Sequence, residues 1–369
     1  FLSLTDLLIC EFKKLITRIA MSQPITTTLP YWGQINGLIS QDAVSLFTTK
    51  ITDKSFDQAK LYRVDSNREH PTLTALNLPV GMEGLTAMAD STVMLIGRDG
   101  YLYQIDWQAK KLAQVSEQST FDLMNNTQTE ADELNRPHPT AIAIASLKDG
   151  VAVLYPEYLL VWAYQNHKLG DCIGNIRLNS ILQTTDNQND NALTINQATT
   201  LAVSSDGNWL VVGDSQGLVS SFHVNAERTA ILHSSSELLH QGAVTALCFE
   251  PIAQQFFSAG ADKQLLRTHV QGKLQGIDRG KASQHTEMIR AMAVSSGTGE
   301  RLYTGSDDKS VKSWQFDKGQ PNTCKDDLVK IRILSVCQYL NQTSVLTVGT
   351  DQSLRFIPVD NEGKLTNVA

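Results

Sequence analysis

The chain has 369 residues, which is longer than one average domain but within the reach of a single repeat architecture. Hydrophobic residues make up 41% and charged residues 19%, so the chain can bury a sizeable core and is not disordered. The net charge of -7 argues against general attraction to nucleic-acid phosphates, and nucleic acid is not an expected partner.

Cysteine usage and apolar runs narrow the class of protein further. The five cysteines are scattered and contain no CxxC pair, which indicates neither a disulfide framework nor a zinc site. We therefore expect a protein of the reducing cytoplasm. The longest apolar run is far shorter than the ~18 residues that cross a bilayer, so we expect no membrane span.

The first 20 residues differ from the rest of the chain. They begin without Met, are followed by Met21, and place Leu4, Leu8, Phe12 and Leu15 at helical spacing. The interpretation we favour is that residues 1–20 are an upstream or non-native extension ahead of a start at Met21. The alternative is a short amphipathic helix that binds a membrane surface or a partner.

From residue 31 onward, the sequence repeats a unit of short strands and polar turns. The third strand of this unit recurs in chain order at Leu61, Leu102, Leu159, Val219, Leu265, Val311 and Leu354. The two longest spacings coincide with polar insertions at 114–136 and 177–197, which we expect to be surface loops between units. A period of about 45 residues with about four strands is typical of a propeller blade.

This repeat predicts an all-β fold: a seven-bladed β-propeller of four-stranded antiparallel blades, with residues 21–369 as one domain. Two segments are available to complete the last blade, residues 363–368 or a strand near 25–29. We favour the N-terminal strand. Closure of the ring is needed because an open ring leaves a strand edge that pairs with other chains.

The best-formed unit runs from His285 to Trp314 and resembles a WD repeat. In that family an opening His, a second-strand Ser or Thr, a turn Asp and a third-strand Trp form a hydrogen-bonded set. The matching residues here are His285, Thr304, Asp308 and Trp314, and in the preceding unit His240, Ser258 and Asp262. The resemblance implies a structural role, since the set satisfies buried polar groups. No unit ends in the Trp-Asp pair that names the family.

Candidate catalytic groups are few. His240 and His285 occupy equivalent positions of neighbouring units, which favours a structural role over catalysis or metal binding. Asp307 and Asp308 are consecutive turn residues, a geometry that rarely supports an acid–base pair. The sequence has no nucleophile elbow, phosphate loop or complete calcium loop. We predict no catalytic residue, no metal and no cofactor.

The resemblance also indicates a docking face, because WD-repeat propellers usually bind partners around the channel end where the first strands begin. We call the corresponding residues the channel-mouth ring: Thr86, His138, Thr199, Thr245, Met288, Arg290 and Arg332. Arg, Met and His suit an interface. The alternative is that each of these side chains only packs the channel mouth.

These observations predict a non-catalytic WD-repeat-like scaffold that binds protein partners within an intracellular complex. One alternative is a hydrolase-like propeller enzyme with a site at the channel mouth, which needs several acidic or His residues there. We count one His and no carboxylate in the channel-mouth ring. Another alternative is a sensor subunit of a multi-component ATPase-associated assembly, which only the architecture supports.

Overall fold

The structure is a computed structural model. It describes residues 25–28, 34–41, 44–50, 59–65, 72–78, 80–90, 92–106, 111–125, 139–180, 197–251, 254–270, 275–278, 285–295, 301–315, 318–324, 328–339, 342–351 and 353–366. The predictions for residues 1–20 and for His138 lie outside this part of the chain, as does most of the insertion at 177–197.

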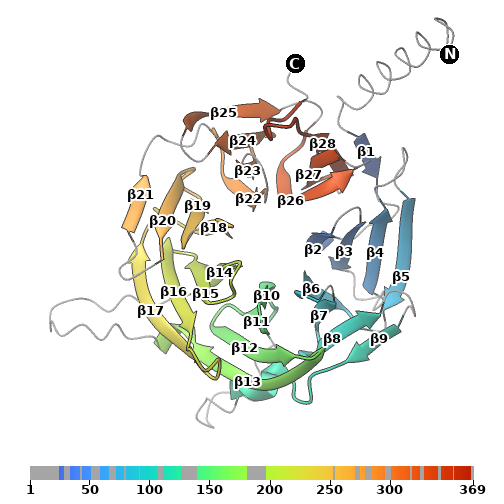
Figure 1. The fold of residues 1–369 in the computed structure, drawn as a ribbon, viewed down its shortest axis with the longest axis vertical. Helices are drawn as coiled ribbons and strands as arrows, with labels where there is room; N and C mark the ends of the chain where they lie inside the picture. The colour runs from blue at the N-terminus through green and yellow to red at the C-terminus, as the bar shows by residue number, and fades with distance from the viewer. Residues whose placement is uncertain are drawn as a thin grey trace, which may run out of the picture.

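The described strands form seven four-stranded antiparallel sheets around a central axis (Figure 1). We number the sheets in chain order. Sheet 1 contains β2 (Gln34–Gln41), β3 (Val44–Lys50), β4 (Ala59–Asp65) and β5 (Thr72–Leu78). Sheet 2 contains β6 (Met82–Ala87), β7 (Val93–Gly97), β8 (Leu102–Asp106) and β9 (Lys111–Gln114). Sheet 3 contains β10 (Ala143–Leu147), β11 (Gly150–Leu154), β12 (Tyr158–Gln165) and β13 (Lys168–Arg177).

The remaining sheets follow the same layout. Sheet 4 contains β14 (Ala198–Val203), β15 (Trp209–Asp214), β16 (Leu218–Val224) and β17 (Ile231–Leu238). Sheet 5 contains β18 (Val244–Phe249), β19 (Gln255–Gly260), β20 (Leu265–His269) and β21 (Gln275–Asp278). Sheet 6 contains β22 (Ile289–Val294), β23 (Arg301–Ser306), β24 (Val311–Gln315) and β25 (Lys318–Cys324). Sheet 7 contains β26 (Ile331–Tyr339), β27 (Gln342–Gly349), β28 (Ser353–Pro358) and β1 (Ile25–Thr28).

The first strand of each sheet lies nearest the axis and contacts the first strand of the next sheet, and β26 of sheet 7 lies beside β2 of sheet 1. Every third strand predicted from the sequence lies in the third strand of a sheet. The predicted all-β propeller of small four-stranded antiparallel sheets is therefore confirmed.

Several second strands are buried along their whole length because a neighbouring sheet covers each of their faces. Residues of β7, β11 and β23 are buried without alternation. Between sheets 3 and 4, side chains such as Leu154, Leu210 and Val212 form one continuous apolar cluster. Burial on both faces produces the continuous hydrophobic runs that a one-sided sheet would not need.

The N-terminal strand closes the ring, as the sequence favoured. Strand β1 pairs antiparallel with β28, and Ile25 lies opposite Phe356. The alternative segment has another place: residues 359–365 form a small hairpin with a bridge between Val359 and Leu365. This hairpin lies against sheet 6, where the Tyr303 hydroxyl donates to the Gly363 carbonyl over 2.8 Å.

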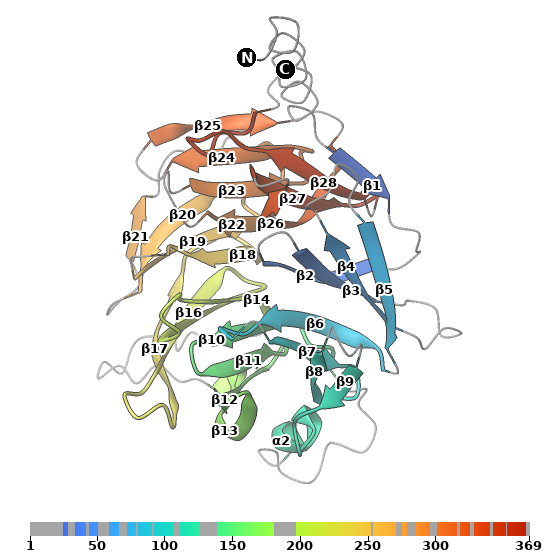
Figure 2. The ribbon, with the colours of Figure 1, turned by 45° about the vertical axis from the view of Figure 1, so that its right-hand side comes forward.

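Part of the first polar insertion is more ordered than we expected from its composition. Within 114–136, helix α2 (Thr120–Asn125) buries Phe121 and Met124 against sheet 3, and is visible beside β9 in Figure 2. The other described helix is a single 3-10 turn at Leu178–Ser180. Neither of these two helices is long and apolar enough to cross a membrane.

Candidate functional site

Sheet 6 contains a continuous chain of buried side-chain hydrogen bonds. His285 Nδ1 lies 2.8 Å from Asp308 Oδ2, and His285 Nε2 lies 2.7 Å from Thr304 Oγ1. The indole N–H of Trp314 donates to Thr304 Oγ1 over 2.8 Å. In a neutral imidazole that donates to the carboxylate from Nδ1, Nε2 accepts the Thr304 hydroxyl proton, so every donor has an acceptor.

Electrostatics at this turn favour an ionised Asp308. Burial alone raises the pKa of Asp308, but hydrogen bonds from His285, Ser310 and the Thr286 amide outweigh it. The net pKa of Asp308 is well below its usual range. Asp308 therefore fixes the start of β22 to the turn between β23 and β24, which is a structural arrangement.

Sheet 5 has the same arrangement with one missing member. His240 Nδ1 lies 3.1 Å from Asp262 Oδ1, and His240 Nε2 lies 2.8 Å from Ser258 Oγ. Burial lowers the pKa of His240, and the neighbouring Asp262 only partly offsets this effect. Thr268 stands where sheet 6 has Trp314, and its buried hydroxyl oxygen has no hydrogen-bond partner among the described residues.

Two other sheets hold the turn aspartate with a different residue. In sheet 2 the Tyr103 hydroxyl donates to Asp99 over 2.6 Å. In sheet 7 the Arg355 guanidinium donates to Asp351 over 2.7 Å. Burial raises the pKa of Asp351, but the hydrogen bonds from Arg355 and Ser353 lower it by more. The resulting pKa of Asp351 is about 2. Four sheets thus tie down the same turn with His, Tyr or Arg.

The first strands share a second feature, a β-bulge near their start. One residue of the first strand is displaced from the ladder in each of six sheets, namely Asn36, Glu83, Thr199, Thr245, Arg290 and Arg332. A bulge re-aims the side chain of the extra residue. Four members of the channel-mouth ring are bulge residues: Thr199, Thr245, Arg290 and Arg332.

The two bulge threonines hold adjacent sheets together. The Thr199 hydroxyl lies 3.1 Å from the Gly213 carbonyl of its own sheet and 2.6 Å from the Val244 carbonyl of sheet 5. Thr245 makes the same pair of contacts, reaching the Ile289 carbonyl of sheet 6 over 2.5 Å. Both hydroxyls are therefore engaged within the propeller.

The bulge position of sheet 2 is Glu83, not Thr86. Thr86 lies three residues further along β6. There its buried hydroxyl accepts a hydrogen bond from the backbone amide of Ser146 in sheet 3 over 3.2 Å. Glu83 is 8% exposed, and its carboxylate accepts the Ala141 amide over 2.6 Å. Glu83 is therefore a carboxylate at a strand start that the channel-mouth ring, which has Thr86 for this sheet, does not include. Alignment of Leu85 with Leu247 would have placed Glu83 opposite Thr245 and revealed it.

The arginines of the channel-mouth ring behave differently from the threonines. Arg290 of sheet 6 donates to Asp307 Oδ2 from Nε and Nη2 over 3.2 and 3.1 Å. Arg332 of sheet 7 lies 3.7 Å from the other oxygen of the same carboxylate. The side chains are 33% and 40% exposed for Arg290 and Arg332, but only 11% for Asp307. We call these three residues the arginine pair and its aspartate.

Residues around the arginine pair extend this surface. Asp307 also donates its backbone amide to the Met288 carbonyl over 2.9 Å, which places the partly exposed Met288 next to the pair. Exposed Lys309 follows Asp308 in the same turn, and exposed Lys330 precedes β26. Exposed Glu287 directly precedes Met288, so this end of sheets 6 and 7 carries carboxylates as well as cations around the arginine pair.

The described residues contain no group of three His, Cys, Asp or Glu side chains that could hold a metal ion. Of the residues predicted from the sequence, the structure brings together the four of sheet 6 and the three of sheet 5 in hydrogen-bonded networks. From the channel-mouth ring it brings together Met288, Arg290 and Arg332. Thr86, Thr199 and Thr245 lie in separate contacts between sheets.

The fold and these networks define a β-propeller with a WD-type repeat. Residues 279–315 match the family "WD domain, G-beta repeat", and this range contains all four residues of the sheet 6 network. A solved structure described as "Crystal structure of WD40 beta propeller domain of Doa1" is similar, with 10% identity and a TM-score of 0.59. The similarity covers 93% of this chain and 98% of that one, and at this identity it shows the fold alone. No curated protein matches the sequence.

Proposed function

We propose that this protein is a non-catalytic scaffold of the cytoplasm, a seven-bladed propeller that binds protein partners at the arginine pair of the channel mouth. The role of a protein-interaction scaffold is typical of WD40 propellers. The hydrogen-bonded sets of sheets 5 and 6 are, in this proposal, structural supports for the docking surface.

The exposed arginine pair is the observation that carries this proposal. Two guanidinium groups share one carboxylate, so the group of three residues keeps one net positive charge. At 33% and 40% exposure, the side chains of Arg290 and Arg332 retain donors that a partner can reach. Arg and Met are enriched at protein interfaces, and Met288 supplies apolar area beside the charge.

Rigidity of the surroundings supports the same role. Thr199 and Thr245 link successive sheets through carbonyl contacts, and Asp307 positions the arginine pair across the boundary between sheets 6 and 7. A surface that is already ordered loses little conformational freedom when a partner binds. The positive charge favours a partner that presents carboxylates, since complementary potentials guide encounter.

The test is affinity capture of partners by the tagged protein, compared with a Met288→Glu/Arg332→Glu variant. Arg290 is retained because removal of both arginines would leave the nearly buried Asp307 without a cation. Lys148→Glu is the matched control, since this exposed residue lies in the β10–β11 turn at the opposite end of a sheet. All three proteins are first compared by thermal unfolding.

We expect one partner to co-purify in stoichiometric amount with the wild type and with the control. The captured amount of this partner should fall at least tenfold with the Met288→Glu/Arg332→Glu protein, which we call the ring variant. Retention by a folded ring variant would move the docking surface elsewhere on the propeller. If the wild type captures no partner, the scaffold role itself is wrong.

A further inference from the structure

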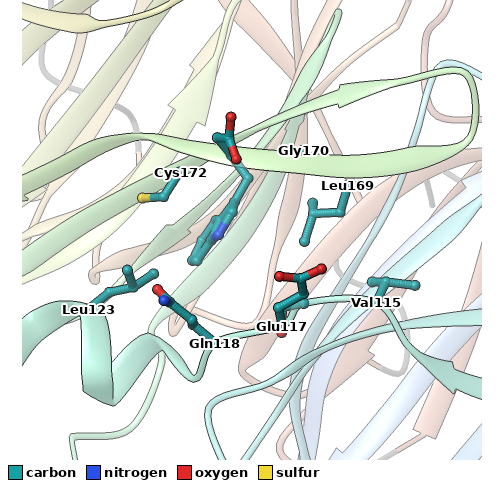
Figure 3. Close-up of a pocket in the computed structure, with 10 residues that line it drawn as sticks. Val115, Glu117, Gln118, Leu123, Leu169, Gly170 and Cys172 are labelled. Carbon is teal, nitrogen blue, oxygen red and sulfur yellow. The ribbon is translucent and has the colours of Figure 1, made fainter.

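A cavity lies on the outer wall of the propeller, between sheets 2 and 3 and away from the arginine pair. It has a volume of about 280 Å³ and is bounded by residues 115–118 after β9, by Leu123 of α2 and by β12 and β13. Figure 3 shows Glu117 and Gln118 extending from the segment before α2 towards β13, and Leu169 extending towards them from β13.

Most of the lining of this cavity is polar, and its apolar part is formed by Trp162 and the side chains packed against it. Trp162 is 4% exposed and packs in the core cluster of sheets 2 and 3, where Val115, Leu123 and Leu169 lie against it. The geometry is fixed from both sides, because Asn175 of β13 donates to the Leu123 carbonyl over 2.5 Å and Ser116 accepts the Leu102 amide over 2.9 Å. The cavity is thus held open by ordered elements.

Trp162 differs from its counterpart in sheet 6. Trp162 lies opposite Val151 as Trp314 lies opposite Leu302, so the position of the acceptor Thr304 is occupied by Val153. No residue in the described part of the chain makes a hydrogen bond with the Trp162 indole. Trp314 thus completes a hydrogen-bonded set in sheet 6, whereas Trp162 at the equivalent position of sheet 3 lines a cavity.

The rim of the cavity is acidic. Glu117 and Asp171 are exposed, and none of the lining residues is cationic. A Lys or Arg side chain has the matching chemistry, with an aliphatic stem for the apolar part of the lining and a cationic head for the carboxylates. Tryptophan is also the best aromatic partner of a cation. The volume is slightly below the ~300 Å³ lower limit of drug-sized pockets, which favours one side chain over a whole small molecule.

We propose that this cavity is a second docking site, which binds a single lysine or arginine side chain of a peptide segment from a protein partner. The proposal rests on the scaffold role and adds a site whose charge is opposite to that of the arginine pair. A partner that uses both sites would have to present carboxylates to the channel mouth and a basic residue to the outer wall.

The test is a titration of the ¹⁵N-tryptophan-labelled protein, followed through the indole N–H signal that disappears in Trp162→Phe. The probes are four capped pentapeptides, Gly-Gly-X-Gly-Gly, with X as arginine, lysine, norleucine or glutamate. We expect the Trp162 signal to shift saturably with the arginine and lysine peptides only. Glu117→Gln should weaken their binding about threefold or more, as for an ion pair at a partly exposed site.

Glu227→Gln is the matched control, since this residue is exposed near the β16–β17 turn of sheet 4 and the change removes the same charge. It should leave the titration unchanged. Equal shifts with norleucine or glutamate, or no shift of the Trp162 signal, would overturn the proposal. The Met288→Glu/Arg332→Glu variant should bind the peptides like the wild type. The outcome of this titration is therefore independent of the outcome of the capture experiment.

Discussion

Sheets 5 and 6 contain the same His–Asp–hydroxyl arrangement but differ in the third-strand residue beside the hydroxyl. In sheet 6 the Trp314 N–H donates to Thr304, while in sheet 5 Thr268 occupies the tryptophan position and its buried hydroxyl oxygen has no partner in the part of the chain that the structure describes. The comparison teaches that Trp314 has two roles, filling space and donating a hydrogen bond. A threonine in its place provides neither and adds a polar atom of its own.

Removal of the central imidazole should have the largest effect. His285→Ala leaves the Asp308 carboxylate and the Thr304 hydroxyl buried without their partner. We expect a loss of about 3 kcal/mol in the free energy of unfolding, measured by urea unfolding. His240→Ala should cost less, because its set has fewer members. Lys148→Ala is the control, since this exposed residue lies in the β10–β11 turn and should change stability by less than about 0.5 kcal/mol.

The turn carboxylate should have a smaller effect that depends on pH. Asp308→Asn removes charge-assisted hydrogen bonds, and we expect a loss of about 2 kcal/mol at pH 7. Because the folded pKa of Asp308 is lowered, its contribution is complete above the unfolded pKa of about 4 and is lost as pH falls further. The stability gap between wild type and variant should therefore shrink below pH 4. A gap that is constant down to pH 2 would contradict the assigned ionisation.

The smallest effect should be a gain. Thr268→Val removes the orphan hydroxyl of sheet 5 and keeps the side-chain shape, so we expect about 1 kcal/mol of stabilisation. Trp314→Phe in sheet 6 should act in the opposite direction, since it removes the indole donor that sheet 5 lacks. Thermal unfolding of both variants checks the comparison. A Thr268→Val protein that is less stable than wild type would show that this hydroxyl has a partner in solution.

Much of the fold was accessible from the sequence because its signals are local. Each third strand is a short β-rich run followed or preceded by polar turn residues, and all of these runs lie in third strands of the structure. The unit from His285 to Trp314 could be identified because its side chains bond within one sheet. Strand β1 was the favoured closing element because an open ring leaves an unpaired edge.

The features that sequence reasoning missed depend on neighbouring sheets. Helix α2 looked like a polar loop because only Phe121 and Met124 are buried, and sheet 3 supplies the surface that buries them. Thr199 and Thr245 suggested a free rim, yet their hydroxyls contact carbonyls of the next sheet. Glu83 was overlooked because a bulge shifts the register of β6. The contacts of α2, Thr199 and Thr245 leave no pattern within one repeat, whereas alignment of Leu85 with Leu247 would have revealed Glu83.

The pairing of β1 with β28 has a consequence for synthesis of the chain. The two strands of this pair are at opposite ends of the sequence, with Ile25 opposite Phe356. During translation, the earlier sheets can pair their strands as they leave the ribosome, but β1 lacks its partner until β28 has been made. For most of that time the nascent chain carries an unpaired strand, which a chaperone must shield or which another chain can capture.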